Sequence, residues 1–264
     1  MGTFAAQLLR GKTAFIAGGS SGINLGIAHG LAEAGASVVL ISRKIEKVET
    51  AVAELKGAGH DASGYAVDVR DYAGVEQALR DAHAARGPID IVVSGAAGNF
   101  LAPAIGMSAN AFKTVIDIDL MGTFHVLRAS YEFLRKPGAS VISISAGQAV
   151  NPTMFQSHVC AAKAGINMLT KCLAMEWGAA GVRVNAISPG PIRDTEGMAR
   201  LTPTAESEAA LKRVIPLGDY GEKRDIADLA VYLCSDEARF LTGVVLPIDG
   251  GWCVSEGQYE NEKT

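Results

Sequence analysis

The stretch TAFIAGGSSGINLGIA, residues 13–28, decides the fold of this chain. It begins with an apolar run that predicts a buried strand, breaks into glycines and serines, and then resumes an apolar pattern suited to a helix. Glycine has no Cβ, so such a turn can approach a pyrophosphate closely, and the start of the helix offers free N–H groups. The stretch therefore predicts a phosphate cradle, although a tight turn that binds nothing is the alternative reading of glycines alone.

The composition limits the classes of protein to which the chain can belong. Its 264 residues are 48% hydrophobic and 20% charged, which is enough for a substantial core in one α/β domain. The net charge of −4, without a basic run, argues against nucleic acid as a partner. The four cysteines are scattered, so we expect neither a metal site nor a disulfide framework. No stretch reaches the roughly 18 apolar residues of a membrane span, so we expect a cytoplasmic protein without a membrane partner.

Predicted strands and helices alternate along the chain. Because no change of composition divides it, we expect one Rossmann-like doubly wound domain, with about seven parallel strands flanked by helices on both faces. Outside this body we expect an N-terminal extension at 1–12, a polar tail at 255–264 and, at 193–215, a weakly periodic segment typical of a mobile substrate flap. The predicted strands are 13–17, 37–42, 64–69, 89–93, 141–145, 183–188 and 244–248, and the later helices are 72–85, 109–134, 156–177 and 225–234.

The end of the second strand indicates which dinucleotide the cradle binds. Ser42, Arg43 and Lys44 lie about 20 residues beyond the glycines, where a dinucleotide fold places the contact to the adenosine ribose. An acid there would bind a free 2′-hydroxyl, whereas a guanidinium suits a 2′-phosphate. Cations at a helix start oppose the helix dipole, which argues against a merely solvated helix end. We therefore favour NADP over NAD.

Later strand ends carry further candidate residues. Asp68, near the end of the strand 64–69, is placed to meet the adenine amino group, and the small residues after the strand 89–93 let a ligand lie against the backbone. Within the long helical region, Asp119 has apolar neighbours. Such an acid either faces solvent or is buried with a partner and a raised pKa.

Taken together, these residues resemble the short-chain dehydrogenase/reductase family over almost the whole chain. Within the turn, Asn24 stands where that family usually has a third glycine. Because Asn tolerates unusual backbone angles, we expect cofactor binding to be retained with altered local packing. The resemblance rests on the turn at 18–23, Asp68-Val69, Ala96-Ala97-Gly98, Lys163, Pro189-Gly190 and Asp249-Gly250-Gly251.

The family's usual catalytic residues are mostly replaced in this chain. The positions of its Tyr, Ser and Asn are occupied by Val159, Ala146 and Asp119, and only Lys163 remains. A carbonyl reductase needs an acid, such as the phenol, to protonate the alkoxide that hydride transfer forms. Valine cannot supply a proton, so ordinary ketone or alcohol chemistry is not expected.

One branch of the family, the peroxisomal-type 2,4-dienoyl-CoA reductases, lacks the same tyrosine and is similar to this chain in several segments. That branch reduces the conjugated diene of an unsaturated fatty acyl-CoA with NADPH, in unsaturated fatty acid degradation. Hydride addition at the far end of the diene pushes charge onto the thioester oxygen, so such a site must stabilise a dienolate and protonate carbon. The similar segments are 96–101, 110–115, 117–119, 122–124, Gln156, His158, 174–178, 189–192 and 195–197.

The resemblance implies a role for each candidate residue. Lys163 would hold the nicotinamide ribose, and Asp119 would relay a proton or orient the lysine, with a salt bridge that has no catalytic role as the alternative. The implied substrate-binding residues are Asn99, Phe100, Gln156 and His158, although a histidine at a helix start is equally compatible with no role. The implied cofactor-binding residues are Gly18, Ser20, Ser21, Gly22, Ile23, Ser42, Arg43, Lys44, Asp68, Val69, Ala96, Ala97, Gly98, Lys163, Pro189, Gly190 and Ile192.

The implied substrate is an acyl-CoA thioester and the implied assembly is a homotetramer. Two alternatives stay open. One is a reductase of a different activated alkene or of a 3-ketoacyl thioester. The other is a non-catalytic NADP-binding sensor or subunit, against which the joint presence of Asp119 and Lys163 argues only weakly.

Overall fold

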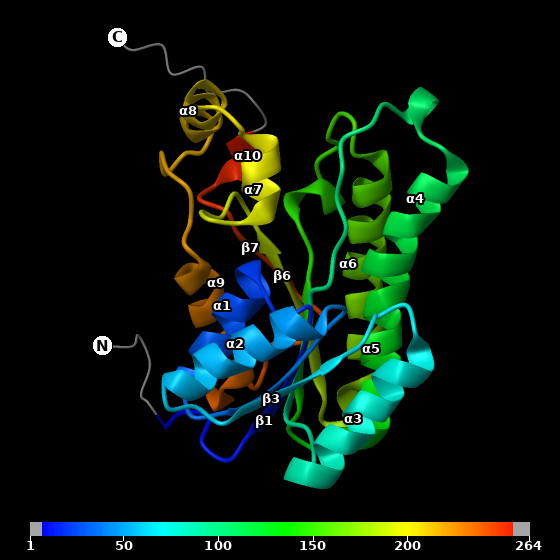
Figure 1. Cartoon of the computed structure of the whole chain (residues 1–264), viewed down its shortest axis with the longest axis vertical. Coiled ribbons are helices and arrows are strands. Elements are labelled where there is room, and N and C mark those ends of the chain that lie inside the picture. The colour runs from blue at the N-terminus through cyan, green and yellow to red at the C-terminus, as the bar shows by residue number, and fades with distance from the viewer. Residues whose placement is uncertain (1–6, 256–264) are drawn as a thin grey trace.

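A seven-stranded parallel sheet forms the centre of the structure, a computed structural model that describes residues 7–255 (Figure 1). The strand order is β3-β2-β1-β4-β5-β6-β7, which confirms the predicted doubly wound fold. Because β1 lies between β2 and β4, the winding of the chain reverses beside its end, where open parallel sheets bind ligands. The strands are β1 (Thr13–Ala17), β2 (Ser37–Ser42), β3 (Ala62–Ala66), β4 (Ile91–Ser94), β5 (Ser140–Ile144), β6 (Arg183–Pro189) and β7 (Val245–Ile248).

Helices cover both faces of this sheet, as predicted (Figure 1). Helices α1, α2 and α9 pack on one face, and α3, α5 and α6 pack on the other. The α-helices in the described residues are α1 (Gly22–Glu33), α2 (Ile45–Gly57), α3 (Tyr72–Arg86), α4 (Ala109–Val115), α5 (Gly122–Ser130), α6 (Ser157–Trp177), α7 (Glu196–Leu201), α8 (Ala205–Arg213), α9 (Lys223–Cys234) and α10 (Trp252–Ser255).

The two helical layers explain the continuous apolar runs of the strands. Successive side chains of a strand point to opposite faces, and both faces of this sheet are covered. Ile16 packs with Ile27 of α1 in one core, whereas its neighbour Phe15 packs with Leu79 of α3 in the other. The first strand is therefore buried at every position, and no polar alternation marks it.

Two predicted strands are displaced by two or more residues at one or both ends, whereas the other strand boundaries agree to within one residue. The strand predicted at 64–69 is β3 (Ala62–Ala66), and Asp68 lies in the turn that follows it. In that turn the Asp71 N–H donates to the Asp68 carbonyl oxygen, at an N···O distance of 2.9 Å. The strand predicted at 89–93 begins only at Ile91, because Ile89 forms an isolated bridge with Leu134 instead.

The helix predicted at 109–134 is helical but not uniform. Between α4 and α5, Ile116–Met121 forms a π-helix, and a 3₁₀ turn follows at Tyr131–Phe133. A π segment widens the helix by one residue and so changes which side chains face the sheet; such segments are frequent at functional sites. This one contains Asp119.

The segments predicted outside the main body contain more regular structure than expected. The segment 193–215 contains α7 and α8, which the sequence did not predict because each is short and polar. Of the predicted extension at 1–12, residues 7–12 are described, and Leu9 is fully buried in the core, so this part is no mere extension. Residues 1–6 and 256–264 lie outside the described residues, while Ser255 ends α10 and is buried.

Candidate active site

A cavity of about 470 Å³ opens at the carboxyl ends of the strands, beside the glycine turn. Residues from the ends of β1, β2, β4, β5 and β6 line it, together with residues of α7 and α8. Every predicted cofactor-binding residue lines this cavity except Gly98. The strand ends that the sequence predicted to bind the cofactor therefore meet around one cavity.

The glycine turn has the form that a pyrophosphate requires. Gly18 has φ +77°, and a Cβ there would lie 2.8 Å from the backbone nitrogen of Ala96, so only glycine fits. Helix α1 begins at Gly22, and the N-cap residue Ser21 makes no side-chain capping bond. The first turn of α1 thus lacks a capping side chain, which suits a bound anion.

Asn24 behaves differently from the expectation. Its backbone is helical, within α1, so this position does not require a residue that tolerates unusual backbone angles. Instead the side chain is buried and its Nδ2 donates to the carbonyl oxygen of Gly95, at 2.8 Å. The altered local packing that the sequence led us to expect is therefore a side-chain contact across the turn.

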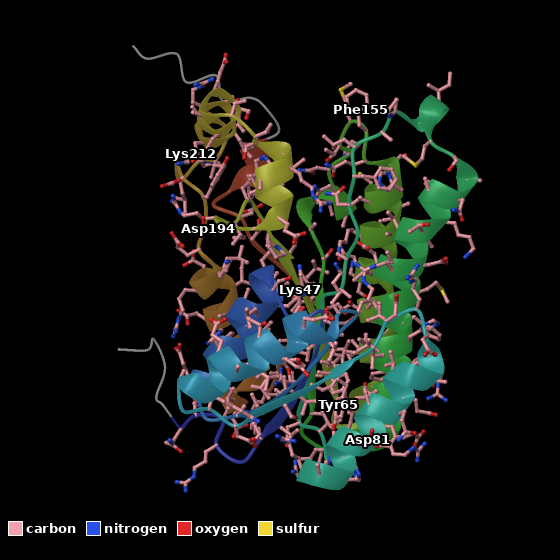
Figure 2. The ribbon with its side chains drawn as sticks, viewed as in Figure 1. Lys47, Tyr65, Asp81, Phe155, Asp194 and Lys212 are labelled. Atoms are coloured by element: carbon pink, nitrogen blue, oxygen red, sulfur yellow. The ribbon has the colours of Figure 1, made fainter. Side chains whose placement is uncertain are left out.

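The ribose end of the cavity is cationic. Arg43 and Lys44 line it, as the sequence predicted. Lys47, in the first turn of α2, lines it as well. Figure 2 shows Lys47 near the middle of the view, below the flap helices. Sequence reasoning missed Lys47, although its place in the first turn of the helix that Lys44 precedes was a usable signal. The pKa of Asp68 is lowered, chiefly by the hydrogen bond from Arg70 and further by the charge of Arg43, so its carboxylate is ionised.

Asp119 and Lys163 meet beside the cavity as a buried pair. Asp119 Oδ1 accepts a hydrogen bond from the Gly98 N–H at 2.7 Å, and its Oδ2 lies 3.4 Å from Lys163 Nζ. Lys163 also donates to the carbonyl oxygen of Ile144, at 3.0 Å. Of the two alternatives left open for Asp119, burial with a partner is the correct one.

The surroundings of Asp119 change its acidity. Burial raises its pKa, while the positive charge of Lys163 and the hydrogen bond from Gly98 oppose that shift without cancelling it. A carboxyl group with a raised pKa keeps its proton to a higher pH than an ordinary aspartic acid does. The raised pKa makes Asp119 a better candidate proton donor than an exposed aspartic acid would be.

The position of the missing phenol is filled by packing. Val159 is buried against Val115 and Ala162, and no hydroxyl replaces the phenol there. Ala146 lines the cavity without a polar side chain. The neighbouring Ser145 also lines the cavity and was missed, but its hydroxyl already donates to Asn167 Oδ1 at 2.6 Å.

The predicted substrate residues form a cluster beside the cavity and do not line it. The Phe100 ring stacks on the His158 ring, with 4.2 Å between centroids and 28° between planes. Gln156 reaches the cavity indirectly, because its Oε1 accepts a hydrogen bond at 3.0 Å from Gln148, which does line the cavity.

Several polar atoms of this cluster are buried and unpaired. Asn99 Oδ1 and both ring nitrogens of His158 make no well-aligned hydrogen bond within residues 7–255. Burial lowers the pKa of His158, although the Phe100 backbone and the charge of Asp119 oppose the shift. A buried polar group without a partner costs about 1–3 kcal/mol, so such a cluster indicates a place for a polar ligand or water.

The flap contributes lining residues that the polar composition of 193–215 concealed. Side chains of Met198, Leu201 and Leu211 face the cavity, and Trp252 of α10 joins them. In the described part of the chain, no helix has the length and apolar character needed to cross a membrane. The same residues contain no group of three or more His, Cys, Asp or Glu side chains arranged to hold a metal ion.

Comparison with known proteins places these features in a family. Residues 17–253 match a family described as enoyl-(acyl carrier protein) reductase. The chain is 43% identical to the (3E)-enoyl-CoA-producing peroxisomal 2,4-dienoyl-CoA reductase of Pongo abelii, over 94% of this chain and 86% of that protein. It is 35% identical to the probable (2E)-enoyl-CoA-producing 2,4-dienoyl-CoA reductase of Bacillus subtilis, over 91% and 96%. A solved citronellol catabolism dehydrogenase of Pseudomonas aeruginosa is 34% identical, with a TM-score of 0.84 and coverage of 96% and 99%.

Proposed function

Because the chain belongs to the short-chain dehydrogenase/reductase family, whose reductases use a nicotinamide cofactor, we propose that it reduces a 2,4-dienoyl-CoA, or a related enoyl thioester, with NADPH. The observation that carries this proposal is the buried Asp119–Lys163 pair, found where the usual phenol position holds the buried Val159. That arrangement keeps a proton donor and a cation but lacks the acid of ketone reduction. It suits protonation of carbon after charge has moved to a thioester oxygen.

The cavity fits a nicotinamide dinucleotide. The uncapped start of α1 would hold the pyrophosphate, and Arg43 with Lys44 would hold a 2′-phosphate. Asp68, ionised and facing the same cavity, would accept from the adenine amino group. Lys163 would bind the nicotinamide ribose. When bound, the reduced cofactor would supply a hydride to the far end of the diene.

The chain's own residues would then manage charge and protons. Lys163 would place a positive charge near the oxygen that becomes negative, which would favour the dienolate. Asp119, held by Gly98 and with a pKa that burial raises, would pass a proton toward the substrate carbon, directly or through a water. The resulting carboxylate would be stabilised by the lysine 3.4 Å away.

The thioester would bind at the cluster of unpaired polar atoms. Asn99 Oδ1 and the neutral His158 ring would be satisfied by polar atoms of the substrate or by its waters. The Phe100 ring, stacked on His158, offers a flat apolar surface suited to a conjugated diene. Gln156 would act on the thioester group through Gln148, which donates a hydrogen bond to Gln156 and lines the cavity.

We assign the segment 193–215 to a flap over the cavity. Two contacts support this: Glu196 Oε1 lies 3.6 Å from Lys47 Nζ, and Arg200 donates to the carbonyl oxygen of Asn99 at 3.1 Å. Exposed ion pairs such as the first contribute only about 0–1 kcal/mol, so this pair by itself does little to hold the flap closed.

We also propose a homotetramer. The supporting observation is a set of partly or fully exposed apolar side chains on α4, the π-helix, α5 and α6, which symmetric contacts would cover. The cytoplasmic location expected from the sequence stays a prediction. The side chains in question are Phe112, Met121, Phe124, Met168 and Met175.

The proposed function is tested by NADPH consumption with a panel of thioesters. The panel contains a 2,4-dienoyl-CoA, a 2-enoyl-CoA and a 3-ketoacyl-CoA of the same chain length. We expect turnover with the diene and little with the ketone. Preference for the 3-ketoacyl-CoA would favour the alternative reductase, and NADPH binding without turnover of any substrate would favour the non-catalytic sensor.

A further inference from the structure

Asn24 connects two strand ends that flank the cavity. It lies in the first turn of α1 and is 8% exposed. Its Nδ2 donates to the Gly95 carbonyl oxygen at 2.8 Å and lies 3.4 Å from that of Gly18. The carboxamide therefore ties the glycine turn that follows β1 to the segment that follows β4.

Asn24 and Gly95 are reciprocal in shape. A Cβ on Gly95 would lie 2.2 Å from Asn24 Oδ1 and 2.6 Å from its Cγ and Nδ2. Gly95 thus leaves open the space that the carboxamide fills. The φ of Gly95 is not in the positive range, so space, and not backbone conformation, requires glycine at this position.

The segment that Asn24 holds leads directly to Asp119. The Gly95 N–H donates to the Ala17 carbonyl oxygen at 3.1 Å, which fixes the start of the segment 95–98 on β1. Ala96 and Ala97 line the cavity. At the other end, the Gly98 N–H donates to Asp119 Oδ1 at 2.7 Å. One short stretch of backbone therefore contacts both the cofactor space and the buried carboxyl group.

We propose that Asn24 is a positioning residue that couples the dinucleotide cradle to Asp119. Its carboxamide holds the segment 95–98 so that Ala96 and Ala97 present their backbone to the cofactor and Gly98 keeps its hydrogen bond to Asp119. Without it, part of the cofactor's binding energy is spent on ordering that segment. A looser Gly98 contact also removes a hydrogen bond that favours the ionised carboxyl.

The test compares Asn24→Gly, Asn24→Ala, Gly95→Asn, and the double variant Asn24→Gly/Gly95→Asn. Dissociation constants for NADPH and NADH are measured by cofactor fluorescence, and the pH profile of kcat is measured with a 2,4-dienoyl-CoA. We expect both Asn24 variants to bind NADPH about 2- to 10-fold more weakly, the range for one hydrogen bond. The pKa in their kcat profile should rise by about 0.5–1 unit.

Comparing Gly95→Asn with the double variant separates a positioning role of the carboxamide from a simple loss of packing. Gly95→Asn alone should bind NADPH poorly, because its side chain meets the Asn24 carboxamide. In the double variant the amide occupies the same space from the other side, and we expect affinity to return to within about twofold of the wild type. Asn24→Ala removes the carboxamide without the helix penalty of glycine, so it remains informative if Asn24→Gly folds poorly.

Asn185→Ala is the matched control. Asn185 is fully buried in β6, and its side chain likewise bonds backbone, to the Leu241 oxygen at 2.9 Å and the Val244 nitrogen at 3.2 Å. Because these contacts lie away from the cavity lining, we expect a lower Tm with unchanged NADPH affinity and pH profile.

Two outcomes would overturn the inference. One is that the Asn24 variants behave like Asn185→Ala, with a lower Tm only. The other is that the double variant binds NADPH no better than Gly95→Asn. The pH profile depends on the proposed function, but the binding measurements need no thioester. Absence of dienoyl-CoA turnover in the wild type would therefore contradict the proposed function alone, and the affinity pattern would still decide this inference.

Discussion

Replacing Asp119 by Asn removes one ionisable group and little else. The amide has nearly the shape of the carboxyl group, and its oxygen can still accept the hydrogen bond from the Gly98 N–H. What is lost is the exchangeable proton and the negative partner of Lys163, 3.4 Å away. The substitution therefore asks whether Asp119 acts as an acid or only as a structural element.

The expected loss of activity follows from that role. A positioned general acid contributes typically about 10²–10⁴-fold to a rate, which corresponds to about 3–5 kcal/mol of activation free energy. We expect Asp119→Asn to lower kcat for a 2,4-dienoyl-CoA within this range. If Asp119 served only as a counter-ion for Lys163, the substitution would weaken cofactor binding and would not lower kcat in this way. The hydrogen bond to the Ile144 carbonyl oxygen would keep the lysine in place.

A stability measurement gives the same substitution a second readout. Burial raises the pKa of Asp119 above its unfolded value near 3.8, so the folded state binds this proton more tightly than the unfolded state does. This contribution to stability is full below the unfolded pKa and is lost as the pH rises through the folded pKa. The stability of the wild type relative to Asp119→Asn should therefore fall as the pH is raised from about 4 through the raised pKa, in urea unfolding at a series of pH values.

Asp117→Asn is the matched control for these measurements. Asp117 lies on the same π-helix but pairs with Lys113 at the surface, so we expect turnover close to that of the wild type. The assay is NADPH oxidation under saturating cofactor. If Asp119→Asn retains the turnover of Asp117→Asn, Asp119 is not the acid.

Three further predictions concern the cofactor and the substrate. Arg43→Ala should narrow the difference in binding free energy between NADPH and NADH by about 1.5–3 kcal/mol, measured by calorimetry, and equal affinity of the wild type for both would contradict the assignment of Arg43. Glu196→Gln should strengthen NADPH binding by at most about fivefold and leave NADH binding unchanged, because it frees Lys47 from an exposed ion pair. An equal change in affinity for both cofactors would speak against a role of Lys47 at the 2′-phosphate. Val159→Tyr should lose diene reduction without gaining strong ketone reduction, since the phenol overpacks a buried site and Ala146 still lacks a hydroxyl. Vigorous turnover of a 3-ketoacyl-CoA by this variant would refute that reasoning.

Local sequence patterns were sufficient to predict which strand ends form the candidate site. The glycine turn, the cations after β2 and the small residues after β4 each lie at a strand end, and a parallel sheet brings strand ends to one edge. Their convergence on one cavity followed from the order of strands alone. The role of Lys163 was predicted from the resemblance to the family, and the long helix that carries it was predicted from its sequence pattern.

The remaining features depend on contacts between distant segments. Whether Asp119 is buried depends on a π-helix and on Gly98, and neither leaves a local pattern in the sequence. Lys47 becomes part of the flap contact only because α7 folds next to α2, and α7 is too short and polar to predict. Asn24 was recognised as unusual, but its partner Gly95 is found only in the folded chain.

The position of hydride addition tests the central claim most directly. The wild type is incubated with a 2,4-dienoyl-CoA and NADPH that carries deuterium at the transferred position, and the product is analysed by NMR and mass spectrometry. We predict deuterium at C5, the far end of the diene, with a proton from solvent at C2 and the remaining double bond between C3 and C4. Deuterium at C3 or at the carbonyl carbon would contradict the account, because neither addition passes through the dienolate that Asp119 and Lys163 are proposed to serve.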